Sequence, residues 1–344
     1  MAPQESTFHE ANLGAMPIRD LGLTIEGTRL EPVVAEFQRE LAAAGIRKLR
    51  PRFYLSTEWG VAFNTVGIAI PFYLARPDLT AIHAERNGHI EGLGPIDILR
   101  YLRHEMGHVV NYGYRLYDEA EWVNLFGSIT QPYVEDYRPA PFSRRYVRHL
   151  PGWYAQKHPD EDWAETFAVW MTPGVDWREE YADRAAALSK LSYCARTMQG
   201  IAEREPIVTS TEPDEDVAQI PYSVDQFYRN LADGPAEFPV GIDGALRAIF
   251  DELGPEESGT TPILKRRSAA ELIRRNERTM LANIYKWTGH FPERTRVLVR
   301  HLAERAGTLN LVYPEDREVP AMVALTTLVT ALAMNHVHRG SYLP

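Results

Sequence analysis

The chain has 344 residues and a formal net charge of −10, with 44% hydrophobic and 24% charged residues, so it is long enough for two domains. The acidic balance argues against a dedicated nucleic-acid binder, because such proteins need basic surface to displace counterions from phosphate. We find no signal-peptide pattern in the first thirty residues and no continuous apolar run of membrane-spanning length, and the single Cys194 suits a reducing compartment as a buried thiol. We therefore expect a cytoplasmic protein without a nucleic-acid or membrane partner.

The N-terminal part of the chain predicts a small mixed sheet. Residues 1–15 read as a flexible lead, and an amphipathic helix is expected over 30–41. Short runs typical of strands follow at 52–56, 60–64 and 66–74. Because Pro71 cannot donate a hydrogen bond to a ladder, the last strand should lie at a sheet edge. That edge is either ordinary or a place where an extended peptide substrate adds as another strand.

The stretch Leu99–Val110 contains the sequence H-E-x-x-H. Its apolar residues recur at three- and four-residue steps, which predicts a helix with one buried face. His104 and His108 lie four residues apart, so both imidazoles project from one face and can bind the same metal ion. Glu105 lies beside them and can act as a base. The alternative is a charged, solvent-exposed turn of helix, and a third ligand decides between the two interpretations.

Residues 112–149 form a long connection rich in aromatic and turn residues, a length often found in lids or walls of active sites. This connection contains a basic cluster in an otherwise acidic protein, formed by Arg144, Arg145, Arg148 and His149. The cluster is either a site for a substrate carboxylate or, as we prefer, a solvated surface.

A second helix is expected to begin at Pro159-Asp160, since acidic residues in a first turn interact favourably with the helix dipole. Glu161 and Glu165 lie four residues apart and share one face. A hydrolytic zinc site has three protein ligands and an open position, and a carboxylate is a suitable third ligand. Another carboxylate can accept the spare N–H of a liganding histidine. Spacing alone does not decide between Glu161 and Glu165, and His158 is a further candidate.

The two motifs together carry a family resemblance. H-E-M-G-H at 104–108, followed by E-D-W-A-E at 161–165, resembles the gluzincin metallopeptidases, specifically the E-x-x-A-E branch that includes lethal factor and the Pro-Pro endopeptidases. The chain is also similar to bacterial zinc-binding metallopeptidases. The resemblance covers about residues 50–195 and implies a zincin-like fold. Lethal factor and the Pro-Pro endopeptidases are secreted, whereas this chain shows no export signal, so their substrates are not carried over.

The resemblance also implies roles for individual residues. In the family, the first glutamate of E-x-x-A-E is the third zinc ligand, which is Glu161 here, and the second supports a histidine, which is Glu165. The family places a tyrosine seven residues before the liganding glutamate, where its hydroxyl assists the transition state. Tyr154 occupies that position.

The rest of the chain is expected to form an acidic linker or surface loop at 202–222 and a helical domain of unassigned role at 223–344, after a metallopeptidase domain at 16–201. Its predicted helices span 223–233, 241–253, 268–288, 292–306 and 318–337. Four histidines in this part lack metal-binding spacing and are interpreted as surface or core residues: His290, His301, His336 and His338.

The sequence therefore predicts an α+β zinc metallopeptidase that acts on a peptide or protein. One Zn²⁺ would be held by His104, His108 and Glu161, with Glu105 taking the proton of the attacking water and Tyr154 binding the oxyanion. One alternative is a zinc amidase or processing enzyme for a small peptide-like metabolite, which a closed pocket would favour. Another alternative is a binding module without catalytic activity, in which the metal only stabilises the fold. It requires an occupied or blocked fourth coordination position.

Overall fold

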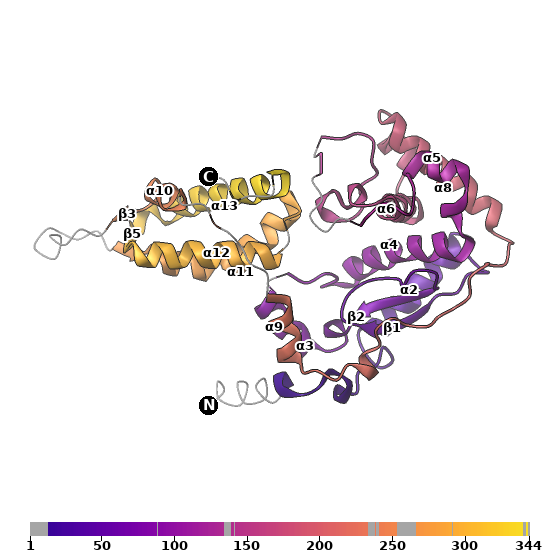
Figure 1. Ribbon diagram of the computed structural model, residues 1–344, viewed down its shortest axis with the longest axis horizontal. Coiled ribbons are helices and arrows are strands. Elements are labelled where there is room, and N and C mark those ends of the chain that lie inside the picture. The colour runs from indigo at the N-terminus through magenta and orange to yellow at the C-terminus, as the bar shows by residue number, and fades with distance from the viewer. Residues whose placement is uncertain are drawn as a thin grey trace, which may run out of the picture. The chain divides into compact units, whose positions relative to one another are not determined.

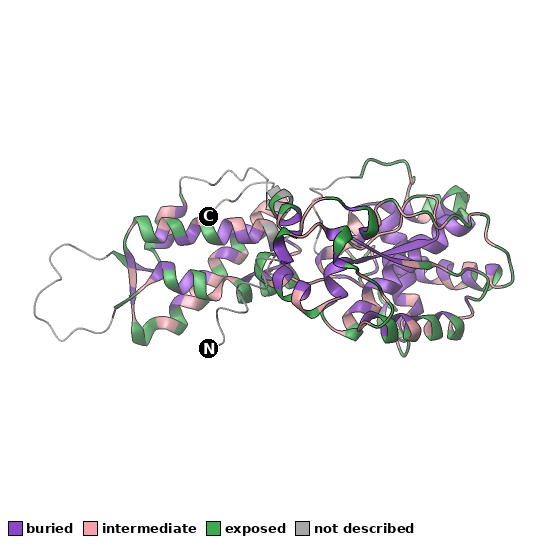
Figure 2. Cartoon of the chain, turned by 90° about the horizontal axis from the view of Figure 1, so that it is seen from below, coloured by how far each residue is buried: buried purple, intermediate pink, exposed green. Residues whose placement is uncertain are grey.

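The computed structural model describes residues 13–87, 89–133, 139–140, 142–232, 238, 241–252, 266–290, 292–339 and 342 (Figure 1). Contacts divide the chain into two compact units. Unit 1 comprises Met1–His83 with Ile90–Arg229, and unit 2 comprises Ala84–His89 with Asn230–Pro344. Each unit has a hydrophobic core of its own, and buried residues line the inner faces of its helices (Figure 2). The protein is of the α+β class, with small sheets and a helical C-terminal region.

The first part of unit 1 is built on a two-stranded parallel sheet. Strands β1 (Arg52–Ser56) and β2 (Gly67–Pro71) pair from Arg52 opposite Gly67 to Ser56 opposite Pro71. Before and after the sheet lie η1 (Ile18–Leu21), α2 (Leu30–Ala43), η2 (Phe72–Leu74) and α3 (Pro77–Asn87).

Pro71 lies at a sheet edge, as its missing N–H predicts. The expected strand at 60–64 is reduced to a single bridge, in which the Ala69 N–H donates to the Gly60 carbonyl at 2.8 Å. Pro71 lies two residues beyond Ala69 and therefore faces the same outer edge. The segment at Gly60 thus already occupies one position of the edge to which a peptide could add.

The second part of unit 1 is helical and carries both sequence motifs. It contains α4 (Pro95–Tyr114), η3 (Leu116–Asp118), α5 (Ala120–Phe126), η4 (Pro151–Gln156), α6 (Pro159–Met171), α7 (Trp177–Glu180) and α8 (Ala185–Ile201). Helix α4 is central, since its residues from Tyr101 to Tyr114 are all buried. A buried ion pair between Arg103 and Glu40, 2.6 Å long, joins α4 to α2. Arg103 directly precedes His104 in the chain, so the ion pair connects the start of the H-E-M-G-H motif to α2.

The segment 202–222 lies within unit 1 and does not stand apart as a linker. Its backbone is paired with that unit, because the Val66 N–H donates to Ser210 O at 2.7 Å and the Arg19 N–H to Ile220 O at 3.1 Å. Its acidic side chains also form hydrogen bonds with the rest of unit 1. For example, the Tyr54 hydroxyl donates to the Asp214 carboxylate at 3.0 Å. The acidic and proline-rich composition therefore marks a strap on the surface of unit 1, which continues through η5 (Val217–Gln219) to α9 (Val224–Ala232).

Unit 2 is mostly helical, as expected, but also contains a small sheet that the helical pattern does not predict. Strands β3 (Asp251–Glu252) and β4 (Arg266–Ser268) pair antiparallel with the central β5 (Leu311–Pro314). The helices are α10 (Ile242–Arg247), α11 (Ala269–Thr288), α12 (Pro292–Thr308) and α13 (Glu318–Arg339), with η6 (Glu315–Arg317) before α13. The predicted helix at 241–253 is shorter in the structure: α10 ends at Arg247, and Asp251–Glu252 form β3.

Among the residues described, one helical segment, Glu315–His338, is long and apolar enough to cross a membrane by length and composition. Only 28% of its most apolar window is buried inside the structure. Threonines interrupt its apolar run, so the sequence shows no continuous apolar stretch of that length. The expected absence of a membrane partner stays a prediction.

Candidate metal centre

Helices α4 and α6 approach each other closely at Gly107 and Ala164. A Cβ atom on Gly107 would lie 2.7 Å from the Ala164 Cα, so only glycine fits at this position. The Trp163 indole N–H donates to the Gly107 carbonyl at 2.7 Å, which adds a hydrogen bond between the two helices at this contact. The glycine of H-E-M-G-H and the alanine of E-D-W-A-E therefore allow the two motifs to meet.

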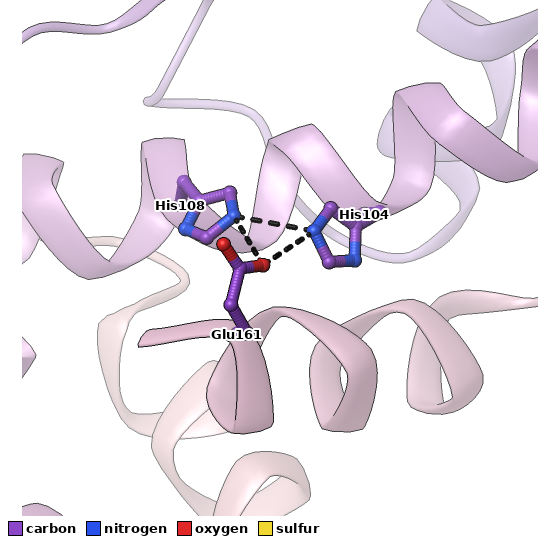
Figure 3. Close-up of side chains that lie close together, drawn as sticks. All are labelled: His104, His108 and Glu161. Atoms are coloured by element: carbon purple, nitrogen blue, oxygen red, sulfur yellow. Dashed lines mark hydrogen bonds and ion pairs between the residues drawn. The ribbon is translucent and has the colours of Figure 1, made fainter. Parts of the chain in front are cut away.

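The contact brings together two imidazoles and one carboxylate (Figure 3). Glu161 Oε2 lies 3.0 Å from His104 Nε2 and 3.4 Å from His108 Nε2, and the two Nε2 atoms are 3.3 Å apart. The three ligand atoms lie within 4.8 Å of one another, and all three residues are buried. His158, the other candidate ligand, is not in this group. It caps α6 by accepting from the Asp160 N–H at 3.2 Å, and its Nε2 donates to Gln131 O at 3.0 Å.

Each histidine is oriented by a carboxylate of its own. His104 Nδ1 lies 2.9 Å from Glu165 Oε1, and His108 Nδ1 lies 2.9 Å from Asp160 Oδ2. Because a carboxylate only accepts, each Nδ1 carries the proton and each Nε2 of a neutral ring presents a lone pair. Two such lone pairs and the Glu161 carboxylate then converge, and only a cation can satisfy all three. The donor set of two imidazoles and one carboxylate fits zinc.

The pKa shifts of the site residues also indicate that positive charge is favoured at this position. Burial opposes protonation of His104, but hydrogen bonds to Glu161 and Glu165 and the charges of Glu161 and Glu105 outweigh it and raise its pKa to about 9. For Glu161, burial favours the neutral acid, yet the two histidines hold its pKa well below the ordinary value. A proton on an imidazole and a bound metal ion can therefore serve as alternative sources of the same positive charge.

Glu165 is the anchor of the second motif. It is fully buried, and besides His104 it accepts the backbone N–H of His149 at 2.6 Å and of Leu150 at 2.8 Å. His149 is therefore not part of a basic surface. Its Nε2 donates to the Arg100 carbonyl at 3.0 Å, and burial lowers its pKa to about 4. The three arginines of the proposed basic cluster are exposed.

Asp160 contacts a residue of the metal group, although the sequence does not single it out. Besides His108, it accepts from Asn111 Nδ2 at 2.6 Å and from the Tyr112 hydroxyl. These two donors follow His108 by three and four residues on α4, so one face of the helix supplies all three. The sequence did not indicate this contact, because acidic residues are common in the first turn of a helix, where they interact favourably with the helix dipole.

Replacing Asp160 with asparagine should weaken zinc binding about 10- to 100-fold, because the neutral amide holds the His108 N–H less firmly and lowers its ligand strength. Titration against a chromogenic chelator measures the affinity. Asp214→Asn is the matched control, since it alters a carboxylate that accepts from a tyrosine outside the centre. Equal zinc affinity in Asp160→Asn and the unmodified protein would contradict the assigned role.

Glu105 and Tyr154 border the metal group. Burial raises the Glu105 pKa, the two histidines oppose the rise, and Glu161 and Asp160 add to it. The Tyr154 ring lies 5.6 Å from the His104 ring between centroids, and burial together with the Glu161 charge holds its pKa well above the ordinary value. Two successive residues with positive φ, Gly152 at 84° and Trp153 at 55°, turn the chain just before Tyr154. Such a conformation is costly for tryptophan and is often found near functional sites.

Comparison with known proteins identifies a family model for the part of the chain that builds this centre. Residues 96–205 match the model of the "Putative zinc-binding metallo-peptidase" family. The match begins in α4 and extends past the end of α8, so it includes both motifs. No curated protein and no solved structure matches the chain. The family match and the buried group of His104, His108 and Glu161 together support a metallopeptidase, and with it a peptide or protein substrate.

Proposed function

We propose that the protein is a gluzincin-type zinc peptidase that hydrolyses peptide bonds with Glu105 as general base. The observation that carries the proposal is the convergence of His104, His108 and Glu161 inside a segment that matches a zinc-binding peptidase family. Zinc bound there lowers the pKa of its water and polarises the scissile carbonyl.

The chain's own residues supply the proton transfer and the oxyanion contact. Glu105 is buried beside the two liganding histidines, and burial raises its pKa, which makes its carboxylate a stronger base. It takes the proton of the attacking water and passes it to the leaving amine. The Tyr154 hydroxyl donates to the carbonyl oxygen as negative charge develops on it. One such donor contributes roughly 2.7–4 kcal/mol in other enzymes.

The number of ligands favours a catalytic site over a structural staple. Structural zinc sites have four protein ligands, whereas catalytic sites have three and an open position. Within the described part of the chain the metal-binding group has three members. We therefore include one zinc ion in the proposal. A cytoplasmic location also belongs to it, supported by the single, buried Cys194.

Digestion of an unbiased peptide library by the zinc-loaded full chain tests the proposal. Mass spectrometry should detect new termini that disappear after treatment with a zinc chelator and return when zinc is added. Failure of the zinc-saturated chain to cleave any peptide would overturn the peptidase assignment. Hydrolysis of small amides alone would instead support the amidase alternative.

A further inference from the structure

A second tyrosine, Tyr133, reaches the metal group from a different segment. Its hydroxyl donates to Glu161 Oε1, whereas Glu161 Oε2 is the oxygen that lies 3.0 and 3.4 Å from the two histidine nitrogens. The two oxygens of one carboxylate thus have different partners. Tyr133 is 47% exposed, so it reaches the centre from the solvent side.

The position of Tyr133 is built into the structure. Its ring packs against Lys157, with Nζ 4.5 Å from the ring centroid, and against the His158 ring at 5.3 Å. The segment 127–133 that carries it is joined to the start of α6 by the hydrogen bond from His158 to the Gln131 carbonyl. The same histidine caps the helix that presents Glu161, so Tyr133 and Glu161 are held by one local framework.

We propose that Tyr133 is a positioning residue that restricts Glu161 to binding the metal through one oxygen. A carboxylate can bind a cation through one or both oxygens. A hydrogen bond from Tyr133 occupies one lone pair of Oε1 and withdraws charge from that oxygen, so Oε2 is the stronger ligand for the metal. The coordination position that Oε1 would otherwise take stays open for water. This inference rests on the proposed zinc site and adds to it a residue outside both sequence motifs.

The test uses Co²⁺ in place of zinc, because four-coordinate Co²⁺ absorbs visible light more strongly than five-coordinate Co²⁺. Tyr133→Phe keeps the ring and its packing but removes the donor. We expect the visible absorption of its Co²⁺ form to fall relative to the unmodified protein, and its zinc affinity to weaken about tenfold. The control Tyr193→Phe removes a tyrosine-to-glutamate hydrogen bond of 3.2 Å to Glu119, away from the metal group, and should change neither property.

The outcomes separate this inference from the proposed function. An unmodified protein that binds neither Co²⁺ nor zinc contradicts the metal site itself and both proposals. A Co²⁺ spectrum that is the same in Tyr133→Phe and in the unmodified protein overturns the role of Tyr133, whether or not the protein cleaves peptides. A lower absorption in Tyr133→Phe but not in Tyr193→Phe supports the role even if the natural substrate is unknown.

Discussion

Replacing Glu105 with glutamine should lower kcat for peptide hydrolysis by about 10²–10⁴-fold while zinc stays bound. Glutamine has nearly the same shape as glutamate, but its amide cannot accept the proton of the attacking water. Glu105 is not a member of the metal-binding group, so the ligands remain complete. Steady-state kinetics on a peptide found in the library digest and zinc analysis of the same sample measure both quantities.

A suitable control for this variant is Glu121→Gln. Glu121 forms an exposed ion pair with Arg196, and such pairs contribute little to stability or activity. Its kcat and zinc content should match those of the unmodified protein. Full turnover by Glu105→Gln would refute the general base, and loss of zinc from that variant would show that Glu105 acts as a ligand instead.

The second large effect is expected from His108→Ala, which should remove both zinc and activity. The change deletes one of three ligands and leaves the buried carboxylates of Asp160 and Glu161 without their common partner. Loss of one member of a buried ion pair commonly costs about 3–5 kcal/mol of folding free energy. Circular dichroism should therefore accompany the zinc analysis, so that loss of metal is measured on folded protein.

Two further variants separate loss of metal from loss of fold. His108→Asn keeps a polar group near Asp160, and it too should lack zinc while being closer to normal stability. His338→Ala changes a histidine of α13 outside the metal group and should retain one zinc per chain. A full equivalent of zinc in folded His108→Ala would contradict the assignment of this ligand.

Much of the centre follows from the sequence because helical geometry is local. Residues four apart share a face, so the pairing of His104 with His108 and of Glu161 with Glu165 could be predicted from spacing. The close contact of the two helices also has a signal in Gly107 and Ala164, although its meaning appears only once the helices are packed.

Other parts could not be predicted, because they depend on contacts between distant segments. Asp160 looks like an ordinary first-turn acid until α4 places His108 and Tyr112 beside it. Tyr133 lies in a connection without periodicity, and only the folded chain brings it to Glu161. The strap at 202–222 has the composition of a linker, yet its backbone pairs with unit 1. Similarly, β3 and β4 are too short to produce an alternating pattern.

The most direct test of the central claim is an anomalous difference map measured at the zinc absorption edge from crystals of the zinc-loaded protein. We predict one peak in unit 1, bounded by His104 Nε2, His108 Nε2 and the Glu161 carboxylate. A map without a peak at this position, or with a peak whose third protein ligand is a residue other than Glu161, would contradict the account.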